Sequence, residues 1–134
     1  MHKIKVGLFD EDCKVDVIET WVHPRPETTV EYDGTKGYKA VLLNYDDQSF
    51  VKLVLDPHSV EFFKLNLFKV TDVMTRALIW RSFFDMVKDA KLTADKYLDI
   101  FRNNIDQEPF DSLFEKQFDL AHAAINSYTP KKYR

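Results

Sequence analysis

The stretch AVLLNYDDQSFVKLVLD, Ala40 to Asp56, marks the point where the hydrophobic period of the chain changes. Two apolar runs flank the polar residues 44–49, a pattern that predicts a β-hairpin with strands near 39–44 and 50–55. Asp56 is a good N-cap residue, and Pro57 suits the first position of a helix. The stretch therefore predicts a hairpin that runs directly into a helix.

Strand-type alternation also occupies the residues before this stretch. Apolar residues alternate with charged ones at Ile4, Val6, Leu8, Val15 and Val17. We predict strands near 3–9 and 14–22, and a shorter strand near 28–32 between the break at Pro24 and Pro26 and the turn DGTKG. Residues 1–56 are thus expected to form an antiparallel β half.

After Pro57 the hydrophobic period lengthens toward 3.6, which indicates amphipathic helices. The first helix is predicted to run through HSVEFFKLNLF. Three more are predicted behind Thr71 or Asp72, behind Thr93, and from near Pro109. Their core-facing residues are expected to be Val73, Ala77, Trp80, Phe84, Val87, Tyr97, Leu98, Phe101, Phe110, Leu113, Phe114, Leu120, Ala121 and Ala124.

Short connections favour antiparallel packing of consecutive helices. Residues 57–134 are therefore predicted to be the first helices of a solenoid-like helical domain, in which each unit buries its apolar face on the next. With the antiparallel β half of residues 1–56, the predicted fold class is α+β.

Composition limits the classes of partner. Hydrophobic residues make up 45% of the 134 residues, enough for a packed core, and a net charge of -3 gives no general attraction to nucleic acid or anionic membranes. The sequence has no apolar run long enough to span a bilayer and no signal-peptide pattern at its start. Cys13 is the only cysteine, so no disulfide framework exists and a cytoplasmic location fits best.

The sequence contains no recognisable catalytic motif. His2, His23, His58 and His122 are scattered, and no His-Glu-x-x-His pattern occurs. Only three glycines are present, which excludes a glycine-rich phosphate loop. The carboxylate pairs at 10–12 and 46–47 are interpreted as solvated turns rather than a cation site. We expect no catalytic, cofactor-binding or metal-ligating residue in this chain.

Three residues, Cys13, Arg76 and Arg81, are candidates for a role beyond structure. Cys13 is predicted to be a structural thiol, because the nearby Glu11, Asp12 and Asp16 raise the pKa of a thiol. Arg76 and Arg81 are predicted to be ordinary exposed arginines of a helix. The alternative is that they point into a cavity and meet a peptide carboxylate.

The order HKIKVGLFD, AVLLNYDDQSFVKLVLDPHS and DVMTRALIWRSFFDMVKDAKLTADKYLDIF resembles the junction of the third and fourth domains in zinc aminopeptidases of the aminopeptidase N family. The matching residues are Leu43, Asn44, Asp46, Phe50, Arg76, Ala77, Trp80, Asp85 and Met86. Phe50 stands where the family often has tyrosine, a change expected to weaken a hydrogen bond but not the packing.

The resemblance implies that residues 1–56 are part of an antiparallel β-sandwich that is truncated at its start. It also implies a parent enzyme that removes amino-terminal residues from peptides with a zinc-bound water. Its zinc ligands and catalytic residues belong upstream, so the implied partners are the upstream catalytic domain and, in the assembled enzyme, peptides. The expected role is structural. An unpaired strand edge and an unfinished helical array also predict self-association. The alternative function is a non-catalytic interaction module that binds a protein through a strand edge or helical groove.

Overall fold

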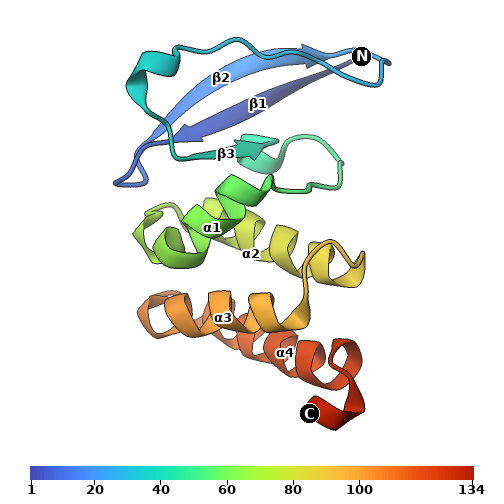
Figure 1. Cartoon of the computed structure of the whole chain (residues 1–134). Helices are drawn as coiled ribbons and strands as arrows, with labels where there is room; N and C mark the ends of the chain where they lie inside the picture. The colour runs from blue at the N-terminus through green and yellow to red at the C-terminus, as the bar shows by residue number, and fades with distance from the viewer.

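The computed structural model describes all 134 residues as an α+β protein with one antiparallel sheet and four α-helices (Figure 1). The strands are β1 (His2–Phe9), β2 (Val15–Val22) and β3 (Ala40–Leu43), in the spatial order β2-β1-β3. The α+β class and the strands expected near 3–9, 14–22 and 39–44 are confirmed. The sheet is a single layer of three strands, and no second sheet completes a sandwich.

The predicted hairpin is wrong, because residues 50–55 form no strand and β3 pairs with β1 instead. The turn after β3 explains the difference. Asn44 adopts a left-handed conformation with φ of 52°, and its side-chain amide donates to the Ser49 carbonyl at 2.8 Å and accepts from the Ser49 amide at 3.1 Å. Asp46 is also left-handed, with φ of 71°. This turn directs the chain away from β3.

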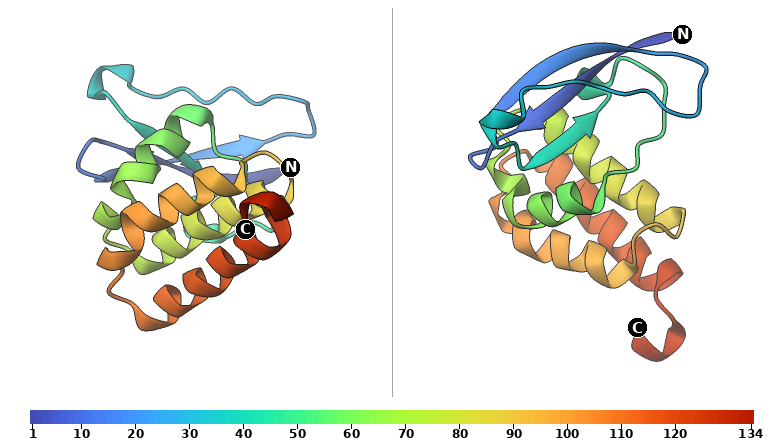
Figure 2. Two further views of the ribbon diagram at one scale, coloured as in Figure 1. Left: turned by 60° about the horizontal axis from the view of Figure 1, so that its bottom comes forward. Right: turned by 45° about the horizontal axis from the view of Figure 1, so that its top comes forward.

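The strand predicted near 28–32 is also absent. Residues 23–39 instead cross the sheet on the side away from the helices (Figure 2). Val6 and Leu8 are each 2% exposed although they lie outside the main core, because alternation along β1 places them on that outer face. Covering this apolar face takes precedence over pairing with the edge of the sheet.

The helices are α1 (Pro57–Asn66), α2 (Val73–Lys88), α3 (Ala94–Asn104) and α4 (Asp111–Tyr128). Asp56, Asp72 and Thr93 cap the first three through their side chains, as predicted. The helices form two layers below the sheet, with α1 packed on α3 and α2 packed on α4 (Figure 1). None of them combines the length and apolar character needed to cross a bilayer.

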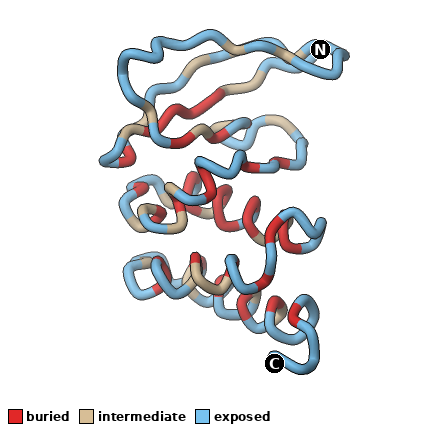
Figure 3. Tube along the Cα trace, viewed as in Figure 1, coloured by how far each residue is buried: buried red, intermediate tan, exposed pale blue.

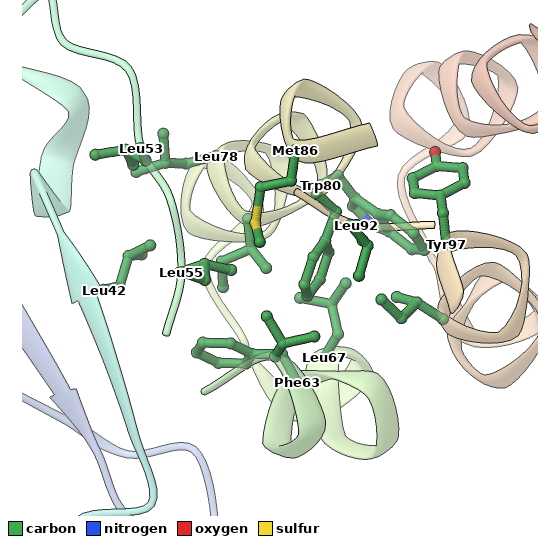
Figure 4. Packing of buried hydrophobic residues seen from close by; sticks show 14 of the residues in the cluster. Leu42, Leu53, Leu55, Phe63, Leu67, Leu78, Trp80, Met86, Leu92 and Tyr97 are labelled. Carbon is green, nitrogen blue, oxygen red and sulfur yellow. The ribbon is translucent and has the colours of Figure 1, made fainter. Parts of the chain in front are cut away.

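One cluster of 23 buried residues extends from the sheet through both helical layers (Figure 3). Leu53 and Leu55, from the predicted strand, lie in this cluster close to Leu42 of β3 and to helix α2 (Figure 4). The core is therefore continuous across the boundary at 56–57, and the division into two domains stays a prediction.

The core-facing side of α2 is wider than predicted. Ile79 and Phe83 are fully buried, whereas the expected Ala77 and Phe84 are only partly covered. Helix α2 lies between the sheet and the lower layer, so it buries residues on two sides. In α4, the expected core residue Phe110 is 51% exposed because it precedes the helix at the N-cap position.

The cap of α2 provides a pH-dependent test of stability. Asp72 accepts hydrogen bonds from the amide and hydroxyl of Thr75 at 2.9 and 2.6 Å, and these bonds lower the pKa of Asp72 below its ordinary 3.8. Replacing Asp72 with alanine is expected to lower the free energy of unfolding by about 1 kcal/mol near pH 7. Because the pKa of Asp72 is lower in the folded state, its ionised carboxylate stabilises the fold at pH values above 3.8. This stabilisation is lost as the pH falls through the folded-state pKa. Urea titrations of both proteins between pH 2 and pH 7 measure the difference, and a gap that widens in acid would contradict this assignment.

Candidate functional site

A groove with a volume of about 720 Å³ lies between α2 and α4. Its floor is apolar, and includes Leu78 and Phe84 of α2 and Leu113 and Leu120 of α4. The turn after β3 closes one side of the groove. A hollow of this size is in the range of ligand-binding pockets.

Charged side chains line the rim of the groove. Arg81 donates to Asp47 at 2.9 Å, and Lys88 pairs with Asp85 at 3.1 Å. The hydrogen bond to Asp47 is the main reason that the pKa of Arg81 is raised. Both pairs are partly exposed, so salt and solvent weaken them and leave them free to exchange partners.

Arg76, in contrast, does not reach the groove, and its predicted exposure is wrong. Its guanidinium makes two hydrogen bonds of 2.9 Å to the carboxylate of Glu108, and the two side chains are 6% and 3% exposed. Its third nitrogen donates to the carbonyls of Val70 and Thr71 at 2.8 and 3.0 Å. Arg76 therefore joins the start of α2 to the connection between α3 and α4.

A buried polar pair that was not predicted from the sequence lies beside the groove. Gln117 lines the groove yet is only 2% exposed, and its Oε1 accepts from the hydroxyl of Tyr97 at 3.3 Å. Burial raises the pKa of Tyr97. The spacing of apolar residues along α4 predicts which side of the helix faces the core, and Gln117 lies on that side. Nothing in the neighbouring sequence, however, indicates that a glutamine at this position is buried.

No group of three or more His, Cys, Asp or Glu side chains comes together in a way that could hold a metal ion. All four histidines are exposed. Asp46 pairs with Lys5 at 2.7 Å and Asp47 pairs with Arg81, so both carboxylates of the turn have cationic partners. The residues present do not fit a zinc site of the kind implied for the parent enzyme.

Cys13 is buried, and its thiol donates to the carbonyl of Asn66 at 3.5 Å. Burial is the largest cause that raises the pKa of the thiol to about 11, and the charges of Asp10 and Asp12 add to it. Lys69 acts in the opposite direction but does not cancel the effect of burial. The thiol is therefore protonated at neutral pH, as expected for a structural cysteine.

The chain is similar in sequence to known proteins. Residues 40–133 match the family model of the ERAP1-like C-terminal domain, and the chain belongs to this family. It is also 29% identical over 132 residues to aminopeptidase N of Streptomyces lividans. The match covers 95% of this chain but 15% of that protein.

These findings confirm the resemblance to the carboxy-terminal part of the aminopeptidase N family. Phe50, one of the residues that carried the resemblance, is fully exposed. The packing expected for it is therefore absent within this chain.

Proposed function

We propose that this chain is a structural, non-catalytic segment from the carboxy-terminal part of a zinc aminopeptidase. It comprises the end of a β-sandwich domain, residues 1–56, and the start of a solenoid-like helical domain, residues 57–134. The observation that carries this proposal is the match to aminopeptidase N over 95% of the chain, combined with its small share of that protein. Zinc and the catalytic groups would be supplied by the upstream domain, in a cytoplasmic enzyme.

The groove between α2 and α4 is the part of this segment that we assign to peptide contact. Arg81 is 53% exposed at its rim and can exchange Asp47 for a peptide group, whereas Arg76 is held by Glu108 inside the protein. The apolar floor would accept peptide side chains. In this proposal the segment forms a wall of the peptide chamber and does no chemistry itself.

A chimera tests the proposal directly. Residues 1–134 replace the matching segment of Streptomyces lividans aminopeptidase N, and hydrolysis of aminoacyl-coumarin substrates is measured. We expect the chimera to be active and the isolated chain to be inactive, with or without added zinc. The enzyme with the segment deleted is the control. Activity of the isolated chain, or a folded chimera without activity, would contradict the proposal.

The alternative function, a non-catalytic interaction module, has one observation in its favour. Phe118 of α4 packs against Phe101 of α3 and Phe114 of α4, and Phe118 is 48% exposed. In a solenoid-like array this surface would pack on the next helices, and in the isolated chain it would favour self-association. Sedimentation of the purified chain distinguishes a monomer from a self-associated module.

A further inference from the structure

A buried polar side chain, Gln117, interrupts the apolar floor of the groove between α2 and α4. Its Oε1 accepts a hydrogen bond from the hydroxyl of Tyr97, which points from α3 toward α4 (Figure 4). Its Nε2 has no hydrogen-bond partner within the chain. The indole Nε1 of Trp80 is the only fully enclosed side-chain donor or acceptor without a partner, so Nε2 of Gln117 is not fully enclosed. Because Gln117 is 2% exposed and lines the groove, this free donor faces the groove.

The amide of Gln117 is held in one orientation. Rotation of the amide would break the hydrogen bond that Oε1 accepts from Tyr97, so the N–H groups of Nε2 stay directed to the groove. Thr75, which also lines the groove and is buried, already uses its hydroxyl to donate to Asp72. A buried donor without a partner is unfavourable. An otherwise apolar ligand that places a carbonyl oxygen at Nε2 would therefore gain a hydrogen bond there, as a peptide main chain can.

The charged groups around the groove leave one cation free. Four carboxylates line the groove, and each has a partner within the chain. These pairs are Asp46 with Lys5, Asp47 with Arg81, Asp72 with Thr75, and Asp85 with Lys88. Lys116 also lines the groove, and it forms no ion pair or side-chain hydrogen bond within the chain. The free charge next to Gln117 is therefore positive and favours an acidic group on the ligand.

We propose that the groove selects peptide segments in which an apolar residue lies next to an acidic one. The apolar side chain would occupy the floor of the groove. Gln117 would donate through Nε2 to a main-chain carbonyl oxygen, and Lys116 would pair with the acidic side chain. This inference rests on the proposed function, which assigns the groove to peptide contact, and it adds the class of peptide that the groove accepts.

Binding of peptides to the isolated chain tests this inference, because every residue that lines the groove belongs to the chain. The probes are two fluorescein-labelled, alanine-rich peptides with amidated carboxyl ends, one with a central Leu-Glu pair and the other with Leu-Lys. Fluorescence anisotropy at low salt gives their Kd values. We expect the Leu-Glu peptide to bind about fivefold more tightly, although the net charge of -3 on the chain favours the Leu-Lys peptide. Equal affinities, or no binding of either peptide, would overturn the inference.

Two variants separate the roles of the two side chains. Gln117→Leu removes the donor without adding a charge, and is expected to weaken the binding of both peptides about fivefold. Lys116→Gln is expected to abolish the preference for Leu-Glu, and it keeps the fold because Lys116 is exposed. Gln107→Leu and Lys96→Gln change exposed residues outside the groove and are the matched controls. A preference that survives Lys116→Gln, or a folded Gln117→Leu variant with unchanged affinity, would overturn the inference.

The chimera with the Streptomyces lividans enzyme separates this inference from the proposed function. In an active chimera we expect the preference for Leu-Glu peptides to appear in KM rather than in kcat, because the groove does no chemistry. An active chimera combined with equal affinities of the isolated chain for the two peptides rejects only this inference. A folded but inactive chimera combined with the expected preference rejects only the role in an aminopeptidase.

Discussion

Replacing Arg76 with methionine is expected to lower the free energy of unfolding by about 3–5 kcal/mol, as measured by urea denaturation at pH 7. Methionine retains most of the apolar stem but removes both hydrogen bonds to Glu108. The carboxylate, which is 3% exposed, would keep only the amide of Phe110 as a donor, at 3.2 Å. A buried charge without a partner is among the most destabilising changes in a protein.

Arg81→Met is the matched control, because it makes the same change on the same helix. The side chains of Arg81 and Asp47 are 53% and 40% exposed, so water solvates either charge when the other is removed. We expect a loss below about 1 kcal/mol. Similar losses for the two variants would contradict the assignment of Arg76 as a buried structural residue.

The double variant Arg76→Met, Glu108→Leu tests the cause of the loss. Replacing both partners of a buried ion pair by apolar residues removes the unpaired charge. We therefore expect it to recover part of the stability lost in Arg76→Met. A double variant less stable than Arg76→Met would show that the loss has another origin, such as the carbonyls of Val70 and Thr71 that Arg76 also binds.

The helix starts could be predicted from the sequence because capping is local. Asp56, Asp72 and Thr93 each accept a bond from an amide three residues later, so the signal lies within one turn. Strand pairing is not local. Residues 50–55 have the composition of a strand, but the turn at Asn44 directs them away from β3 and onto the helices. Composition alone cannot report this competition between pairing and burial.

The candidate site was less predictable because its residues meet across the fold. Arg76 finds Glu108 at a separation of 32 residues, and Tyr97 finds Gln117 at a separation of 20. Arg76 and Arg81 lie on the same helix with similar neighbours, yet one is buried and the other is exposed. The family could be recognised without knowledge of these contacts, because the resemblance depends on the order of residues along the chain. It does not depend on which side of α2 packs against α4.

The second large effect is expected at Trp80. Its side chain is 1% exposed in the core, where its ring packs edge-on against Tyr97 with centroids 6.4 Å apart. Trp80→Ala removes this ring and leaves a cavity between α2 and α3. We expect the free energy of unfolding to fall by about 3–5 kcal/mol. Circular dichroism at 222 nm during urea denaturation is a suitable measurement, because it does not depend on tryptophan fluorescence.

Trp80→Phe distinguishes packing from hydrogen bonding at the same position. The indole Nε1 of Trp80 is buried without a hydrogen-bond partner, so phenylalanine loses no hydrogen bond and removes an unsatisfied donor that costs about 1–3 kcal/mol. This gain offsets part of the lost volume, and we expect Trp80→Phe to be well under half as destabilising as Trp80→Ala. Equal losses for the two variants would mean that the indole N–H makes a stabilising bond in solution. Trp21→Ala, at a 50% exposed position, is the control and is expected to change stability by less than about 1 kcal/mol.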